Sequence, residues 1–246
     1  MIIIPMAGLS TRFLSKGFDL PKYMLEAHGK SLFDWAILSF KKYFKTQVFL
    51  FICRDVYGTR PFIEKHCLEL GIANFNIIEL KFETLGQGHT VLLGLKEASV
   101  SNQEPLVIFN IDTYRIGYEF PKFTETQEVS GYLECFLGSG PNWSNVITKD
   151  SYSDCVIRTS EKKNESNLCC TGLYFFSTST LFREAYTAYH RADDLTTENE
   201  HFIAPIYNHL ISKGKTIKVD IIKRSSVIFF GTPGEYQKFR KITLKL

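Results

Sequence analysis

The first 25 residues, MIIIPMAGLSTRFLSKGFDLPKYML (1–25), decide the fold that we expect for this chain. The three isoleucines at 2–4 predict a buried strand that breaks at Pro5. The loop that follows contains one glycine, two hydroxyl side chains and one arginine, at Gly8, Ser10, Thr11 and Arg12. Small residues let backbone N–H groups approach phosphate oxygens, and a guanidinium group neutralises their charge. Together with Lys22, which follows a proline, this loop predicts a cradle for a nucleoside triphosphate.

Strands and helices are expected to alternate through the first half of the chain. The continuously apolar segment 47–53 predicts a strand buried on both faces, as parallel sheets require. The other expected elements are strands at 76–80 and 105–111 and helices at 31–45, 61–71 and 88–99. This alternation indicates right-handed crossovers and an α/β, Rossmann-like three-layer sandwich with a mostly parallel central sheet. Ligands of such sheets bind beyond the carboxyl ends of the strands.

The second half has a more mixed pattern. Strands are expected at 132–137, 143–148, 154–159, 171–176, 216–222 and 226–230, and helices at 178–189, 198–212 and from Thr232 onward. Neither a low-complexity linker nor an internal repeat divides the sequence. We therefore expect one domain over 1–246, in which 1–130 form a nucleotide-binding half and 131–246 an acceptor-binding half.

Composition limits the classes of function. A chain of 246 residues with 44% hydrophobic residues can bury an extensive core. The net charge of +3, without a long basic run, argues against a nucleic-acid partner and suits anionic small substrates. The six cysteines lack paired zinc spacing and are interpreted as reduced, buried thiols. Without a basic leader or a bilayer-length apolar run, we expect a cytoplasmic protein with no membrane partner.

Asp112 closes an expected strand in the sequence FNIDT (109–113). A carboxylate at this position faces the ligand crevice, and a hard oxygen ligand suits Mg²⁺ that bridges triphosphate oxygens. The alternative is an aspartate that only caps the next turn.

A second loop, 84–90, has two glycines that allow close approach to a flat ligand. Its Gln87 offers both a donor and an acceptor, whereas His89 is interpreted as structural.

The glycine-containing loop with Arg12, followed by Pro21-Lys22, resembles the signature of the sugar-phosphate nucleotidyltransferases, a GT-A-like superfamily. The sequences PMAGLSTRF (5–13) and PKYML (21–25) resemble those of the branch found in bacterial capsule and surface-polysaccharide synthesis. That branch includes a cytidylyltransferase that acts on phosphoglutamine. The resemblance implies a transferase that joins a nucleoside monophosphate, CMP favoured, to a phosphorylated acceptor with release of pyrophosphate. An example is the reaction of CTP with phosphoglutamine to CDP-glutamine.

The resemblance also implies roles for individual residues. The catalytic set is Arg12, Lys22 and Asp112, with Asp112 as the ligand of Mg²⁺. The nucleotide-binding residues are Met6, Ala7, Gly8, Leu9, Ser10 and Thr11 in the first loop, and Leu85, Gly86, Gln87 and Gly88 in the second. The acceptor-binding residues are Glu161 and Lys162 in a Glu-Lys motif, Gly172 in a Thr-Gly-x-Tyr strand, and Glu200 in the segment Asn199 to Asn208, where a role in complementing a helix dipole is equally open.

Two positions depart from the family pattern. Ile111 replaces the glycine that usually precedes the metal-binding aspartate. Phe229 stands where many members have a second metal-binding aspartate, two residues ahead of Gly231-Thr232-Pro233. Either one carboxylate suffices, or another acid such as Asp220 helps, or catalysis is impaired.

Three other functions compete with this interpretation. A glycosyltransferase would have an Asp-x-Asp motif, of which Asn110-Ile111-Asp112 is half. A non-catalytic nucleotide-binding subunit would explain Phe229, and a sugar 1-phosphate with another triphosphate remains open as the substrate pair. A P-loop kinase is excluded because no glycine loop ends in Gly-Lys-Ser/Thr. The oligomeric state is open, with a homo-oligomer among the expectations.

Overall fold

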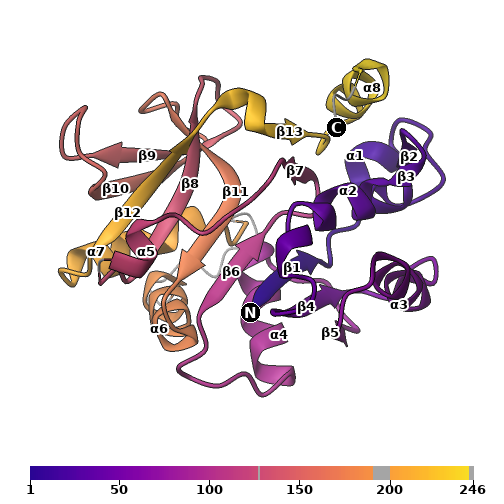
Figure 1. The fold of residues 1–246 in the computed structure, drawn as a ribbon, viewed down its shortest axis with the longest axis horizontal. Helices are drawn as coiled ribbons and strands as arrows, with labels where there is room; N and C mark the ends of the chain where they lie inside the picture. Colours follow the sequence, from indigo (N-terminus) through magenta and orange to yellow (C-terminus); the bar gives the residue numbers. More distant parts are fainter. Residues whose placement is uncertain (127, 191–199, 244–246) are drawn as a thin grey trace.

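The computed structural model describes residues 1–126, 128–190 and 200–243. One nine-stranded sheet contains strands from both halves of the chain, in the order β10-β9-β11-β6-β1-β4-β5, with β8 beside β11 and β12 beside β8 (Figure 1). Its parallel first-half strands are β1 (Ile2–Met6), β4 (Val48–Cys53), β5 (Asn74–Glu79) and β6 (Leu106–Phe109). Its second-half strands are β8 (Gly131–Leu137), β9 (Ser144–Thr148), β10 (Val156–Glu161), β11 (Leu168–Phe176) and β12 (Ile217–Ile222). Because β11 runs antiparallel to β6, the mixed second half continues directly from the parallel first half.

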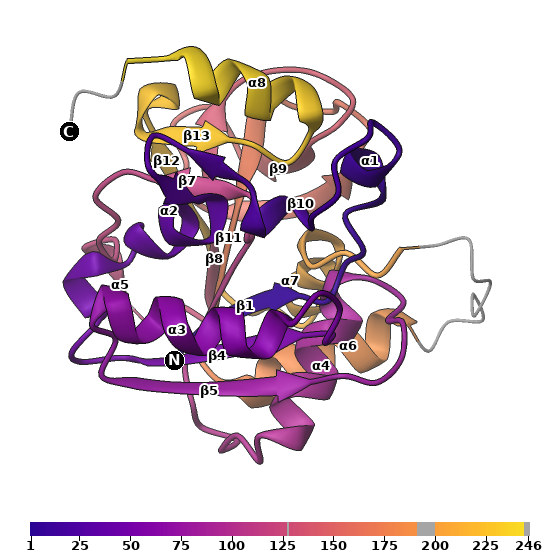
Figure 2. The ribbon, with the colours of Figure 1, turned by 90° about the vertical axis from the view of Figure 1, so that its right-hand side faces the viewer.

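Helices cover both faces of this sheet, which confirms the predicted three-layer α/β architecture. Alternate side chains of β1 point to opposite faces: Ile2, Ile4 and Met6 belong to one core and Ile3 to the other. The first core is covered by α2 (Leu32–Leu38), α3 (Thr59–Leu70) and α8 (Pro233–Lys241). The second core is covered by α4 (Gln87–Glu97), α6 (Ser179–His190) and α7 (Tyr207–Ser212). Figure 2 shows α8 and α4 at opposite sides of the molecule.

Most predicted elements are present, and capping residues explain where several helices begin or end. Ser31 caps α2 in a capping box with Asp34, and Thr232 caps α8 with Glu235. Gly71 ends α3 in the left-handed conformation, with a φ of 75°. The position of each of these ends was predictable because it depends on a local side chain.

Several predicted boundaries are wrong. The strand expected at 105–111 ends at Phe109, so Asp112 lies in the turn before β7 (Thr113–Arg115) and does not close the strand. Strand β1 does not break at Pro5 but continues to Met6. Strand β1 pairs with β6 only at Ile2 and Ile3. Pro5 lies beyond this ladder, so its missing N–H removes no hydrogen bond between the two strands. The helix expected over 31–45 ends at Leu38 and resumes as a short 3-10 turn, η2 (Lys41–Tyr43).

The helix expected over 198–212 is also shorter. Its start at 198–199 lies outside the described residues. Within the described part it is a 3-10 turn, η3 (Ala204–Ile206), followed by α7. Pro205 has no N–H and therefore favours a helix start over a helix interior.

Several short elements were not predicted. They are α1 (Thr11–Leu14), η1 (Lys22–Met24), α5 (Phe123–Thr126), η4 (Arg224–Ser226), the β2 (Glu26–Ala27) and β3 (Lys30–Ser31) hairpin, and β7 (Thr113–Arg115). Strand β7 pairs with the predicted final strand, β13 (Val227–Phe229), in a separate two-stranded sheet. This small sheet lies beside the carboxyl end of β6 and brings the last part of the chain to Asp112.

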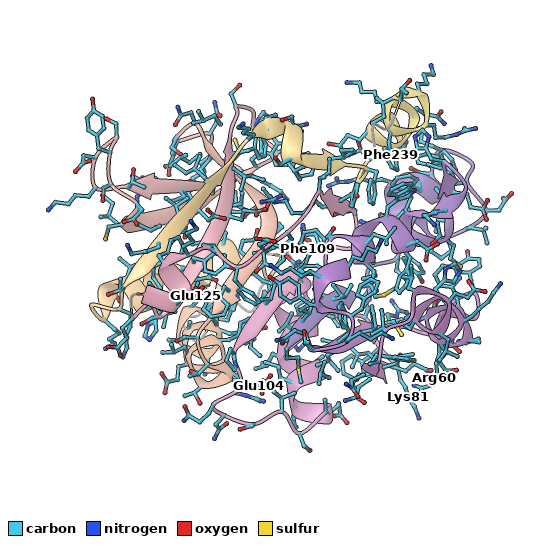
Figure 3. The ribbon with its side chains drawn as sticks, in the orientation of Figure 1. Arg60, Lys81, Glu104, Phe109, Glu125 and Phe239 are labelled. Atoms are coloured by element: carbon cyan, nitrogen blue, oxygen red, sulfur yellow. The ribbon has the colours of Figure 1, made fainter. Side chains whose placement is uncertain are left out.

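Aromatic side chains fill much of the interior. Phe109, at the end of β6, is fully buried near the middle of the ribbon, whereas Arg60, Lys81 and Glu104 lie at its periphery (Figure 3). All six cysteines are free thiols, and five of them are buried. Of the helices in the described part of the chain, none has the length and apolar character needed to cross a bilayer.

Candidate active site

A cleft of about 990 Å³ opens beyond the carboxyl ends of β1 and β6. Fifteen of the seventeen residues predicted for the site line it: Met6, Ala7, Gly8, Leu9, Ser10, Arg12, Lys22, Leu85, Gly86, Gln87, Asp112, Glu161, Lys162, Gly172 and Glu200. The structure places the other two outside the lining. Thr11 is exposed at the start of α1, and Gly88 is buried behind the second loop.

Lys22 and Asp112, 90 residues apart in the sequence, form an ion pair in this cleft. The Lys22 Nζ to Asp112 Oδ2 distance is 2.6 Å, and the side chains are 22% and 24% exposed. Lys22 is held from the first loop, because its backbone N–H donates a hydrogen bond of 3.1 Å to Ser10 Oγ. Ser10 adopts the left-handed conformation, with a φ of 55°. The turn after β1 therefore positions the lysine as well as lining the cleft.

Asp112 is fixed by backbone contacts from two other segments. The adjacent Asn110 N–H donates to the Gly172 carbonyl at 3.1 Å, and the Asp112 carbonyl accepts from the Phe230 N–H at 3.0 Å. A Cβ atom on Gly231 would lie 2.7 Å from Asp112 Oδ2, so a side chain at this position would displace the carboxylate. In the Gly-Thr-Pro sequence, Gly231 thus allows the backbone to approach the Asp112 carboxylate closely, and Thr232 caps α8.

The position expected for a second acid is occupied by an aromatic cluster. The Phe229 ring lies 4.6 Å from Trp143 and 5.5 Å from Phe136, and the Arg224 guanidinium is 5.0 Å from its centre. Asp220 does not line the cleft; it lies on β12 opposite Glu134, and burial raises its pKa.

The residues present fit a magnesium ion only in company with a substrate. Among residues 1–126, 128–190 and 200–243, no group of three or more His, Cys, Asp or Glu side chains could hold a metal. Mg²⁺ commonly binds through one or two carboxylates, with substrate phosphates and water completing its octahedron. Asp112 alone meets that requirement when a triphosphate supplies the other oxygens.

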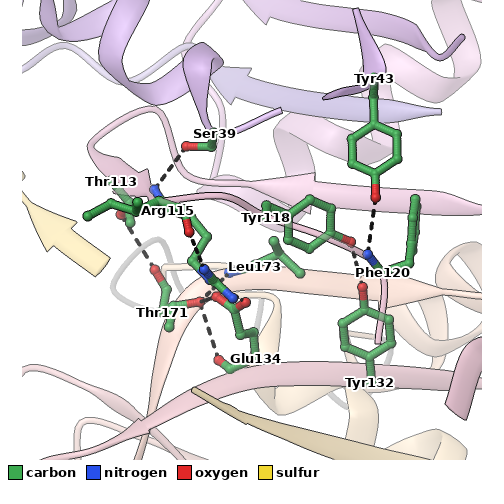
Figure 4. Close-up of polar contacts among 11 residues, drawn as sticks. Ser39, Tyr43, Thr113, Arg115, Tyr118, Phe120, Tyr132, Glu134, Thr171 and Leu173 are labelled. Carbon is green, nitrogen blue, oxygen red and sulfur yellow. Dashed lines mark hydrogen bonds and ion pairs between the residues drawn. The ribbon is translucent and has the colours of Figure 1, made fainter. Parts of the chain in front are cut away.

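A buried polar network lies behind Asp112 and joins three strands (Figure 4). Arg115 Nε on β7 donates to Glu134 Oε2 on β8 at 2.7 Å, and the Glu134 side chain has no exposed surface. Thr171 Oγ1 on β11 donates to the other oxygen of Glu134 at 2.9 Å. Burial raises the pKa of Glu134, against the opposing effect of Arg115. The network holds β7, which directly follows Asp112, against the strand that carries Gly172.

The second loop is held by its own side chains. The Gln87 amide nitrogen donates to Asn110 Oδ1, and His89 Nδ1 accepts from the Leu85 N–H at 3.1 Å. Burial lowers the pKa of His89, which keeps this nitrogen available as an acceptor. The structure thus agrees with a structural role for His89, and Asn110 emerges as the partner of Gln87.

The predicted acceptor residues come together on the opposite wall. Ser144 Oγ donates to Glu161, and burial is the main cause of the raised pKa of that carboxyl group. Lys162 has a φ of 54° and its Nζ lies 3.7 Å from Glu200 Oε2 and 4.2 Å from the centre of the Phe202 ring. Both charges are largely exposed, so this wall is less tightly held than the Lys22 side.

The lining residues that were not predicted for the site include Asn110, Trp143, Phe202 and Gly231. Asn110 and Gly231 have a signal in the sequence, since each lies within two residues of a motif already singled out. Trp143 and Phe202 have none, because their place in the wall depends on how the second half packs.

This fold occurs in solved structures of sugar-nucleotide pyrophosphorylases and of a CTP transferase. A nucleoside-diphosphate-sugar pyrophosphorylase from Vibrio cholerae RC9 is 45% identical, with a TM-score of 0.93 over 98% of this chain and 100% of that one. An inositol-1-phosphate CTP transferase from T. maritima (17% identity, 100% and 96% of the two chains) and a UDP-glucose pyrophosphorylase complexed with UDP-glucose (20% identity, 97% and 96%) each give a TM-score of 0.73. No family model and no curated protein matches the chain.

The V. cholerae similarity covers almost all of both chains, whereas the two more distant structures share the fold. The identity of 45% is high enough to assign the family and not the substrates. This protein therefore belongs to the same family of nucleotidyltransferases as the V. cholerae nucleoside-diphosphate-sugar pyrophosphorylase.

Proposed function

We propose that this protein is a cytidylyltransferase that transfers CMP from CTP to a phosphorylated small acceptor in capsule or surface-polysaccharide precursor synthesis. Phosphoglutamine, giving CDP-glutamine, is the acceptor suggested by the resemblance of the first loop. The observation that carries the proposal is the Lys22–Asp112 ion pair of 2.6 Å, located beside the Gly8 to Arg12 loop in a cleft large enough for two anionic substrates.

In the proposed reaction, an oxygen of the acceptor phosphate attacks the α-phosphorus of CTP. A P–O bond to the α-phosphorus forms as the bond to the β-phosphate oxygen breaks, and pyrophosphate leaves with the electron pair. Both reactants are anions, so orientation and charge neutralisation supply most of the rate. No covalent intermediate on the protein is required.

The charged residues of the cleft divide this work. Lys22 neutralises charge on the α-phosphate, Arg12 binds the phosphates that depart, and Lys162 holds the acceptor phosphate. Asp112 and the triphosphate would hold Mg²⁺, which neutralises phosphate charge when bound. The Lys22 ammonium group is itself the ion-pair partner of the Asp112 carboxylate.

The preference for cytosine is supported by Gln87. Its amide nitrogen donates one of its two N–H groups to Asn110, and its carbonyl oxygen is available to accept a hydrogen bond from a base. A carbonyl oxygen accepts from the exocyclic amino group of cytosine, whereas uracil presents an oxygen at that position.

The test is Mg²⁺-dependent pyrophosphate release from CTP, UTP, dTTP, ATP and GTP, each with phosphoglutamine, sugar 1-phosphates and phosphorylated alcohols. We expect release with CTP and phosphoglutamine, and its loss with EDTA or in Asp112→Asn. Asp150→Asn, at an exposed turn, is the matched control.

Two other outcomes would replace this proposal. Release only with a sugar 1-phosphate and another triphosphate would favour the second candidate, which the V. cholerae similarity supports. Triphosphate binding without release would indicate the non-catalytic subunit that Phe229 allows.

A further inference from the structure

The tripeptide Glu200–Phe202 crosses from the acceptor wall to the second loop. On one side, Glu200 and Phe202 contact Lys162, at 3.7 and 4.2 Å. On the other, the backbone of His201 makes two hydrogen bonds to the loop. The His201 N–H donates to the Leu85 carbonyl at 2.8 Å, and the His201 carbonyl accepts from the Gly88 N–H at 2.7 Å.

Both glycines of the loop are required by this contact. A Cβ atom on Gly86 would lie 2.5 Å from the His201 nitrogen, and one on Gly88 would lie 3.1 Å from the His201 oxygen. Gly86 also has a φ of +137°, which other residues rarely adopt. The glycines that were expected to admit a flat ligand therefore also admit the backbone of His201.

The side chain of His201 anchors the tripeptide inside the second core. Tyr186 on α6 lies with its hydroxyl 2.5 Å from His201 Nδ1, and the two side chains are 6% and 4% exposed. The His190 ring stacks on His201 with centres 3.7 Å apart and planes 14° apart. Burial raises the pKa of Tyr186 to about 12 and lowers that of His201, so both groups are neutral near pH 7 and a single hydrogen bond joins the hydroxyl to the ring nitrogen.

The exposed contacts with Lys162 contribute far less. An ion pair of 3.7 Å with both side chains about half exposed is worth little, because water screens it. A buried hydrogen bond whose loss leaves a ring nitrogen without a partner has a larger effect. Of the side-chain hydrogen bonds and ion pairs of the tripeptide, the bond to Tyr186 is therefore the strongest.

We infer that His201 is a positioning residue, anchored by Tyr186, whose backbone holds residues 85–88 in the shape that receives the nucleobase. The identity of the ligand, a nucleobase, rests on the proposed function. The contact between His201 and residues 85–88 does not. It also makes one short segment the common border of the nucleotide and acceptor subsites.

The test compares Tyr186→Phe with Tyr189→Phe, the same change at a 44% exposed tyrosine of the same helix. In Tyr186→Phe we expect the KM and dissociation constant for CTP to rise about fivefold, the factor equivalent to about 1 kcal/mol, with kcat unchanged. Tyr189→Phe should match the unchanged protein. His201→Leu should reproduce the defect, and His201→Asn should restore most of the affinity, because its side-chain amide can replace Nδ1 as the hydrogen-bond partner of Tyr186.

Hydrogen exchange separates failure of this inference from failure of the proposed function. Peptides covering 84–90 should exchange faster in Tyr186→Phe than in Tyr189→Phe, whether or not CTP binds. Unchanged exchange and unchanged CTP affinity in both Tyr186→Phe and His201→Leu would overturn the inference. If the unchanged protein binds no triphosphate, the proposed function fails, while faster exchange would still support the loop contact.

Discussion

The two sides of the cleft hold opposite charges in different ways. On the nucleotide side, Lys22 and Asp112 are 2.6 Å apart and less than a quarter exposed. On the acceptor side, Lys162 and Glu200 are 3.7 Å apart and 43% and 56% exposed. Because the first pair is closer and less exposed, water screens it less than the second pair.

The difference suggests a division between chemistry and recognition. Groups that stabilise charge in a transition state work best when they are fixed before the substrate arrives. Groups that recognise an acceptor can be exposed, since the ligand itself completes their surroundings. The predictions below test this division.

The largest expected effect is on turnover. Lys22→Ala should lower kcat for pyrophosphate release about 10³-fold, or about 4 kcal/mol, because it removes a fixed cation from the α-phosphate. The folded protein should survive, as a partly exposed pair contributes about 1 kcal/mol or less to stability. An assay of pyrophosphate release measures kcat, and thermal unfolding measures stability. Lys42→Ala, which removes a 2.7 Å ion pair with the exposed Glu119, is the control. Intact pyrophosphate release in Lys22→Ala would refute the role given to this lysine.

The second prediction concerns the network behind the nucleotide side. Arg115→Met should lower the free energy of unfolding by about 3 kcal/mol, because it leaves the fully buried Glu134 without its charged partner. Arg158→Met removes an ion pair of the same 2.7 Å length to an exposed partner, and should cost less than about 1 kcal/mol. Urea unfolding of both variants gives the comparison. Equal losses would mean that burial does not distinguish the two pairs.

The same division separates what the sequence could predict from what it could not. The cradle after β1 was predictable because apolar periodicity places the strand, and Lys22 follows at a short, proline-bounded distance. Asp112 was predicted at the end of a strand; the strand itself ends at Phe109, and Asp112 lies in the turn that leads into β7. The end of α2 at Leu38 was not, because it depends on Ser39, whose hydroxyl accepts from the Arg115 N–H at 2.9 Å, 76 residues away.

The acceptor wall was predictable only in part. The resemblance named Glu161, Lys162 and Glu200, yet their meeting depends on strand pairing and on the irregular segment before η3. Trp143 and Phe202 carry no local signal, since aromatic residues in this chain are mostly core. Phe229 was singled out as a departure, but its packing against Trp143 and Phe136 follows only from the β7–β13 pairing.

The third prediction tests the border between the two sides. Gly86→Ala should cost about 2 kcal/mol of stability or shift the loop, because the added Cβ would meet the His201 nitrogen at 2.5 Å in a backbone conformation unsuited to alanine. We expect a higher KM for the triphosphate and a lower unfolding free energy. Gly234→Ala has open space in α8 and should be neutral or slightly stabilising. If Gly86→Ala behaved like Gly234→Ala, the close packing of the loop against His201 would not exist in solution.

The smallest expected effect is a dependence of stability on pH that comes from the border between the two sides. Tyr186, His89 and His201 surround His190, and burial with the two neighbouring histidines lowers its pKa to about 4. A histidine whose pKa is lower in the folded than in the unfolded protein takes up its proton on unfolding, so its destabilising effect grows as the pH falls from 6.5 towards 4. We expect the free energy of unfolding to fall by about 1 kcal/mol between pH 6.5 and 5. This is less than the whole pKa shift of His190 would give, because the ring is partly exposed and water screens its charge. His190→Gln should flatten this slope without changing stability near pH 8. An equal slope in both proteins would show that His190 does not contribute to the dependence of unfolding on pH.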